Sequence, residues 1–166
     1  MGSEGLSESR PVEFGWQPTP LSKPPLLVFH VNDSTDDQVL FQTACKRAQV
    51  PFQWHVAESA ERGISYLDSL VAMNRKEPVR WPDLLLLDLI LPELSGLKVL
   101  EHVRKTPELQ LMPVVVLTGQ AGPELIEQAL KMGANSYHTK PNDFGGWVEL
   151  VRMLYTIWSS AKRPKL

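Results

Sequence analysis

From Leu26 onward, short apolar runs alternate with segments of helical periodicity, and this alternation restricts the possible folds more than any other feature. An apolar run of about four to eight residues between turn signals is typical of a strand buried on both faces. Strands that alternate with helices form βα units on a parallel sheet. The sequence therefore predicts an α/β domain, with a doubly wound five-stranded parallel sheet flanked by five helices.

Five segments are predicted as strands. They are LLVFHV (26–31), FQWHVA (52–57), LLLLDL (84–89), MPVVVL (112–117) and NSYHT (135–139). The helices between them have recognisable ends, because Ser59 suits an N-cap and Pro123 suits the first turn of the fourth helix. Gly133 is placed to end that helix, and Asn142 or Asp143 can cap the last one.

The chain divides by composition into three parts. Residues 1–25 are rich in Gly, Ser, Glu and Pro and are predicted to form a flexible N-terminal arm. Residues 26–160 form the predicted domain, and residues 161–166 are a short basic tail. A chain of 166 residues, 43% of them hydrophobic, suits one domain with a substantial core.

Charge and cysteine content narrow the functional classes. A formal net charge of −2 predicts neither nucleic-acid binding nor attraction to an anionic membrane. We find no run of about 20 apolar residues and no signal-peptide pattern. The single cysteine, Cys45, cannot form an internal disulfide. We therefore expect a cytoplasmic protein with no membrane and no nucleic acid among its partners.

At their carboxyl ends, four of the five predicted strands lead into polar residues. The first leads into Asn32 and Asp33, the third into Asp88, the fourth into Thr118 and the fifth into Lys140. Ligands of open parallel sheets bind outside the carboxyl ends of the strands. We therefore expect these side chains to converge at one rim of the sheet.

Such a grouping suits phosphoryl transfer to a carboxylate. Asp33 and Asp88 offer the oxygen ligands that Mg²⁺ prefers, and the metal would lessen repulsion between the Asp88 nucleophile and a phosphoryl group. Lys140 supplies a mobile cation and Thr118 a hydroxyl donor for phosphoryl oxygens. A carboxylate directly after four leucines is costly to bury without such partners.

Four segments together resemble the motif blocks of the receiver domains of response regulators in two-component systems. They are HVNDSTDD (30–37), PDLLLLDLILPELSG (82–96), PVVVLTG (113–119) and GANSYHTKP (133–141). They stand in the family's order and spacing, and the resemblance covers Leu26 to about Ser160. It implies the flavodoxin-like topology of receivers.

The resemblance assigns a role to individual positions. It implies that Asp88 is the phosphoacceptor, Asp33 a direct Mg²⁺ ligand, Ile90 the donor of a backbone carbonyl to the metal, Thr118 the switch hydroxyl, Tyr137 the switch aromatic and Lys140 the family lysine. Asn32 departs from the pattern, since its position usually holds a second acid. We expect Asn32 to contact the metal through water and to weaken Mg²⁺ binding. The long loop before the third strand is similar to that of single-domain regulators associated with bacterial phytochromes.

The resemblance also implies partners. A sensor histidine kinase or a phosphotransfer protein would donate the phosphoryl group, and the receiver itself would promote its transfer and later hydrolysis. The output would be altered affinity for a downstream protein target. The last helix carries Leu150, Met153 and Ile157 beyond its core stripe, which predicts a homodimer or partner contact through the fourth and fifth helices.

Two alternatives remain open. A hydrolase of the haloacid-dehalogenase kind also uses a strand-end Asp, but Ile90 stands where that chemistry needs a second acid. A phosphorylation-independent pseudo-receiver would serve only as an interaction module, and Asn32 is its main support. The four histidines, His30, His55, His102 and His138, are assigned to packing, since their spacing does not suit a metal.

Overall fold

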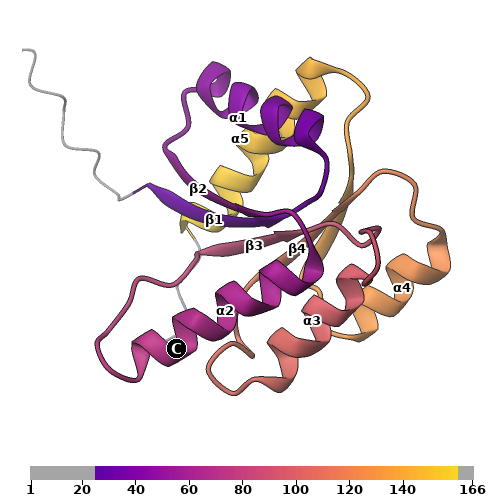
Figure 1. Ribbon diagram of the computed structural model, residues 1–166. Coiled ribbons are helices and arrows are strands. Elements are labelled where there is room, and N and C mark those ends of the chain that lie inside the picture. Colours follow the sequence, from indigo (N-terminus) through magenta and orange to yellow (C-terminus); the bar gives the residue numbers. More distant parts are fainter. Residues whose placement is uncertain (1–24, 161–166) are drawn as a thin grey trace, which may run out of the picture.

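A computed structural model describes residues 25–160, which form a five-stranded parallel sheet between two layers of helices (Figure 1). The strands are β1 (Leu26–Val31), β2 (Phe52–Ala57), β3 (Leu84–Leu87), β4 (Val114–Thr118) and β5 (Ser136–Thr139). Their order across the sheet is β2-β1-β3-β4-β5, which confirms the predicted doubly wound topology. The predicted arm, apart from Pro25, and the predicted tail lie outside the described residues.

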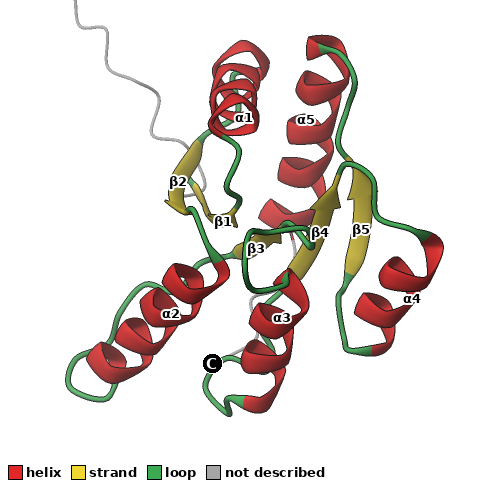
Figure 2. Cartoon of the chain, turned by 45° about the vertical axis from the view of Figure 1, so that its right-hand side comes forward, coloured by secondary structure: helices red, strands yellow, loops and turns green. Residues whose placement is uncertain are grey.

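Five helices cover the sheet. They are α1 (Thr35–Ala48), α2 (Ala60–Asn74), α3 (Gly96–Lys105), α4 (Pro123–Lys131) and α5 (Phe144–Ser160). Figures 1 and 2 show α1 and α5 on one face of the sheet and α2, α3 and α4 on the other. Each layer of helices packs on the sheet and forms an apolar core with it. The four leucines of β3 are fully buried, and they belong alternately to the two cores. In the described part of the chain, no helix is long and apolar enough to cross a membrane.

The strand boundaries differ slightly from the prediction. The third strand ends at Leu87 instead of Leu89, because beyond Asp88 the chain turns into the loop that leads to α3. The fourth begins at Val114 instead of Met112, since the Met112 amide donates to the Leu109 carbonyl in a turn and Pro113 has no N–H to donate. It also extends to Thr118, while the fifth starts at Ser136.

The helix ends follow the predicted signals. The Ser59 hydroxyl accepts a hydrogen bond from the Arg62 amide at 3.1 Å, and Pro123 opens α4. Asp143 rather than Asn142 caps α5, with its carboxylate accepting from the Gly146 amide at 2.7 Å. Gly133 follows the end of α4 with φ of 103°, a conformation that L side chains rarely adopt.

Candidate functional site

The polar residues at the strand ends meet where the sheet topology switches. β1 and β3 are neighbours in the sheet although β2 lies between them in the sequence, so their connections leave in opposite directions. Asn32 and Asp33 follow β1, and Asp88 follows β3. Thr118 ends β4 and Lys140 follows β5, so both stand at the same rim.

Asp88 is the buried centre of this rim, with 3% of its surface exposed. One carboxylate oxygen, Oδ1, accepts a hydrogen bond from the Ile90 amide at 3.0 Å, and Oδ2 contacts the Lys140 ammonium at 2.5 Å. Burial raises the pKa of Asp88, and the bonds from Lys140 and Ile90 offset part of that rise. The nearby charge of Asp33 raises the pKa further, which places the two acids in one electrostatic site.

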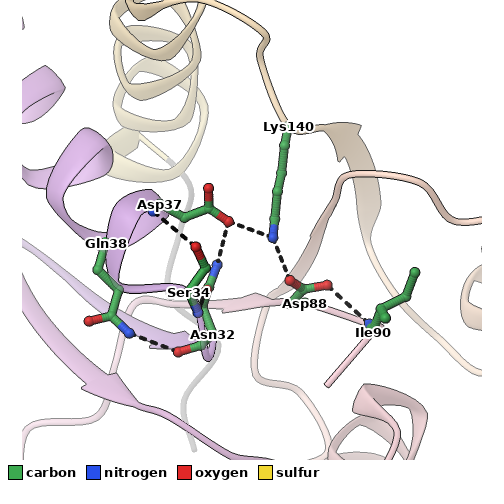
Figure 3. Close-up of polar contacts among 7 residues, drawn as sticks. All are labelled: Asn32, Ser34, Asp37, Gln38, Asp88, Ile90 and Lys140. Atoms are coloured by element: carbon green, nitrogen blue, oxygen red, sulfur yellow. Dashed lines mark hydrogen bonds and ion pairs between the residues drawn. The ribbon is translucent and has the colours of Figure 1, made fainter. Parts of the chain in front are cut away.

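Lys140 bridges two carboxylates, as Figure 3 shows. Its Nζ lies 2.5 Å from Asp88 Oδ2 and 2.6 Å from Asp37 Oδ2. Burial alone would lower the pKa of the ammonium, but the bonds to Asp37 and Asp88 outweigh it and the pKa is raised. The side chain is therefore held charged between the end of β3 and the first turn of α1.

A hydrogen-bonded turn joins β1 to α1 behind this bridge. Asn32 is fully buried, and its Oδ1 accepts from the Ser34 amide at 2.6 Å. The Ser34 hydroxyl caps α1 by accepting from the Asp37 amide at 3.3 Å. The Asn32 backbone carbonyl accepts from Gln38 Nε2 at 2.9 Å, and Asn32 Nδ2 donates to Asp37 Oδ2 at 3.4 Å. The turn thus fixes where the Asp37 carboxylate lies.

Thr118 carries an unpaired hydroxyl beside this network. It is 2% exposed, and among the described residues its Oγ1 has no hydrogen-bond partner. Its carbonyl accepts from the Lys140 amide at 2.9 Å, which ties the two residues together through their backbones. A buried hydroxyl normally has a partner, so this one is available to donate to an anionic group at the rim.

The loop from Asp88 to Gly96 approaches the site closely. Gly96 donates its amide to the Leu89 carbonyl at 3.0 Å and begins α3. A Cβ at Gly96 would lie 2.0 Å from the Asp88 carbonyl oxygen, so no larger residue fits without displacing the backbone. Glu93 has φ of 63°, in the left-handed region that non-glycine residues rarely adopt. This loop leaves the Ile90 side chain 54% exposed.

The remaining predicted residues lie around the rim. Tyr137, on β5, is 43% exposed and so points away from the core. Asp33 is exposed. Among the described residues no three His, Cys, Asp or Glu side chains gather into a metal site. The carboxylates of Asp33 and Asp88 and the backbone carbonyl of Ile90 are nonetheless oxygen donors of the kind that suits Mg²⁺. This ion keeps several waters when it binds to proteins, so it does not need a full set of protein ligands.

The histidines lie apart from any metal arrangement. His30 is fully buried under the site, and neither ring nitrogen has a hydrogen-bond partner among the described residues. Burial, with a smaller contribution from the charge of Lys140, lowers the pKa of His30 to about 3. His55 stacks on Tyr66 with ring centroids 4.3 Å apart, and His102 pairs with Asp68 at 2.7 Å.

Two residues of the site, Asp37 and Gly96, were not predicted from the sequence. Asp37 stands beside Asp36 in the first turn of α1, where acids commonly complement the helix dipole. Its phase with buried Phe41, four residues later, was the signal that it faces inward. Gly96 had no comparable signal, because its need for glycine arises from a contact with the loop before it.

The comparisons with known proteins agree with this geometry. Residues 28–152 match the model of the response regulator receiver domain. Response regulator Rcp1 of Synechocystis is 28% identical over 137 residues, covering 82% of this chain and 91% of that protein.

Two solved structures have the same fold. The phosphorylated cyanobacterial phytochrome response regulator RcpA has a TM-score of 0.72 and 28% identity, covering 85% of this chain and 99% of that one. The Mn²⁺-bound form of Rcp1 has a TM-score of 0.68 and 25% identity, covering 86% and 100%. The resemblance found in the four motif blocks is thereby confirmed. The chain belongs to the response regulator receiver family and is homologous to phytochrome-associated single-domain response regulators.

Proposed function

We propose that Asp88 is the residue of this receiver that accepts the phosphoryl group. The observation that carries the proposal is the pairing of a buried carboxylate with a charged lysine beside an unpaired hydroxyl. Asp88 would attack the phosphorus, and the bond from phosphorus to the donor would break. Lys140 would neutralise one phosphoryl oxygen, and the Thr118 hydroxyl would donate to another.

Magnesium is the proposed cofactor. The carboxylates of Asp33 and Asp88, with the backbone carbonyl of Ile90, would hold it, while Asn32 would act through a bound water. A bound divalent cation would neutralise charge that otherwise repels an anionic donor from the carboxylates. The solved structure of Rcp1 with Mn²⁺ supports a divalent site in this family, although it concerns that protein.

Phosphorylation would act on partners through Thr118 and Tyr137. The Thr118 hydroxyl would move toward the phosphoryl group, and the space it leaves would admit the exposed Tyr137 ring. The two residues stand on neighbouring strands, Thr118 on β4 and Tyr137 on β5. In the register of these strands, Tyr137 lies opposite Val116 and Thr118 lies opposite Thr139. A shift at the site would therefore reach the surface through two adjacent strands.

The proposed partners are a sensor histidine kinase or phosphotransfer protein as donor and a downstream protein as target, in the cytoplasm. A homodimer through α4 and α5 is also proposed, with exposed Leu130 and Ile157 as its apolar contacts. Leu150 was predicted to be part of this contact surface, but it is only 6% exposed and belongs to the core beneath α5, so it does not contribute to the surface. Light scattering after size-exclusion chromatography tests the dimer, and a monomer with and without phosphorylation would contradict it.

The test of the central proposal is incubation with acetyl phosphate and Mg²⁺, followed by intact mass spectrometry. We expect an adduct of one phosphoryl group that disappears in Asp88→Asn. Asp83→Asn is the matched control, because Asp83 is also buried but stands at the opposite end of β3. Loss of the adduct in the control alone, or its persistence in Asp88→Asn, would contradict the assignment.

The same experiment decides between the alternatives. A pseudo-receiver would give no adduct in the unmodified protein, whereas the unpaired Thr118 hydroxyl and the paired Asp88 and Lys140 support a working site. Membership in the receiver family argues against the haloacid-dehalogenase alternative. The apolar side chain of Ile90 argues against it too, since it cannot protonate a leaving group.

A further inference from the structure

Asp37 places a third carboxylate at the rim. Its position in the first turn of α1 suits the helix dipole, but its contact with Lys140 goes beyond that role. Its Oδ2 contacts the Lys140 ammonium at 2.6 Å, about as closely as Asp88 does. The side chains of Asp37 and Lys140 are 19% and 17% exposed, so both are largely shielded from solvent. A pair with this burial is screened less than a surface salt bridge.

Asp37 is itself held by two contacts, one at its carboxylate and one at its backbone amide. Asn32 Nδ2 donates to the same oxygen that contacts Lys140, at 3.4 Å. The Asp37 backbone amide donates to the Ser34 hydroxyl, which anchors the residue in the first turn of α1. Figure 3 shows these contacts as one chain from Asn32 through Asp37 to Lys140 and Asp88.

We infer that Asp37 is a positioning residue, which holds the Lys140 ammonium beside Asp88 for phosphoryl transfer. A lysine side chain has four rotatable bonds and loses considerable entropy when it is fixed. With Asp88 as its single partner, the ammonium would be free to swing away once that carboxylate carries a phosphoryl group. Asp37 keeps a second contact that phosphorylation of Asp88 does not remove, so the cation stays at the phosphoryl oxygens. This inference rests on the proposed role of Asp88.

Asp36 provides a matched control on the next position of the same helix turn. It is exposed and has the same charge and the same distance from the helix N-terminus to within one residue. The variants Asp37→Asn and Asp36→Asn therefore change net charge and helix-dipole interactions alike. They differ in the contacts of the side chain with Lys140 and Asn32, which Asp37 makes.

The first measurement is the rate of phosphorylation by acetyl phosphate at saturating Mg²⁺. We expect Asp37→Asn to slow it about tenfold, the order of effect that renewed lysine rotamer freedom produces. Asp36→Asn should stay within about twofold of the unmodified protein. Thermal unfolding of both variants is followed alongside, so that a folding defect is recognised as such.

The second measurement reports on the ammonium without any reaction. Lys140 is much less exposed than Lys98, Lys105 and Lys131, whose side chains are 59–75% exposed, so its ammonium protons exchange more slowly with water. We expect a lysine ammonium cross-peak in ¹H–¹⁵N spectra that Lys140→Arg removes. It should persist in Asp36→Asn and broaden or vanish in Asp37→Asn.

The outcomes separate the two proposals. If the unmodified protein gives no adduct, the proposed function fails, while the ammonium spectra still decide whether Asp37 holds Lys140. If the unmodified protein reacts and Asp37→Asn reacts equally fast or faster, the positioning role is wrong. An unchanged Lys140 cross-peak in folded Asp37→Asn would also overturn it.

Discussion

Two aspartates flank β3, Asp83 before it and Asp88 after it, and both are buried. Both are aspartates next to the same strand and both are buried, yet their surroundings differ. Asp83 Oδ2 accepts from the Leu27 backbone amide at 2.8 Å and lies 3.5 Å from the Arg80 guanidinium. Its own amide donates to the Leu27 carbonyl at 2.8 Å. Asp83 thus continues the pairing of β3 with β1 beyond the strand itself.

Arg80 extends this amino-end network to two further segments. Its guanidinium donates to Gln53 on β2 at 2.8 Å and to the Pro25 carbonyl that precedes β1. The contacts of Arg80 and Asp83 thus link β2, the residue before β1 and the start of β3.

The partners of the Asp88 side chain lie outside the strands. Lys140 is a long side chain shared with a second carboxylate, and the Ile90 amide belongs to a loop. Parallel strands direct their carboxyl ends toward loops and helix N-termini, which can surround a ligand, while the amino ends meet the preceding chain. The two buried acids of β3 therefore differ in what holds them: Asp83 is bound to the neighbouring strand, whereas Asp88 is bound to a loop amide and to a long side chain.

The largest expected effect comes from the loop next to Asp88. Gly96→Ala should lower the free energy of unfolding by about 3 kcal/mol, because its Cβ would lie 2.0 Å from the Asp88 carbonyl oxygen and backbone must move. Urea denaturation measures the loss. Gly122→Ala is the control, since a Cβ there would meet no atom within 4 Å apart from its neighbours in the chain. Equal losses in both variants would show that the close approach does not constrain the loop.

The next largest effect is expected at Asp83, at the amino end of β3. Asp83→Ala should cost about 2 kcal/mol of unfolding free energy, because the part-buried Leu27 amide loses its acceptor. Asp83→Asn keeps a side-chain oxygen and should cost less. Both variants should take up a phosphoryl group at nearly the rate of the unmodified protein. A strong loss of phosphorylation in folded Asp83→Asn would contradict the proposed difference between a structural acid at the amino end of β3 and a phosphoacceptor at its carboxyl end.

Much of the fold could be predicted because short stretches of the sequence are enough to identify the strands and the helix ends. Four leucines before Asp88 identify a buried strand, and Ser59, Pro123 and Gly133 mark helix ends by their own backbone chemistry. The parallel topology then brings the residues after β1, β3, β4 and β5 to one rim without any knowledge of side-chain contacts.

What could not be predicted depends on contacts between distant segments. The phase with Phe41 favours Asp37 over Asp36 as the inward-facing acid of α1, but only the contact with Lys140, far along the chain, places it in the site. Asp83 and Gly96 have roles set by Leu27 and by the Asp88 carbonyl. The exposed position of Tyr137 likewise depends on how β5 packs at the sheet edge, which its own sequence does not encode.

The smallest effect is a gain in stability. Burial raises the pKa of Asp88, so ionising this carboxyl costs more in the folded protein than in the unfolded chain. Asp88→Asn should therefore raise the free energy of unfolding at neutral pH by about 1 kcal/mol, a common size for a stabilising substitution at a functional site.

The pH dependence of that gain has a definite sign. At pH values below the ordinary pKa of an aspartate, Asp88 is neutral in both states and the two proteins should be equally stable. As pH rises through the raised pKa of the folded state, the unmodified protein loses stability relative to Asp88→Asn, and the difference then stays constant. Urea denaturation from acid to neutral pH measures this difference, with Asp83→Asn beside it. A variant less stable than the unmodified protein at neutral pH would mean that the bond to Lys140 outweighs the burial of the charge, and Asp88 would then resemble Asp83 as a structural acid.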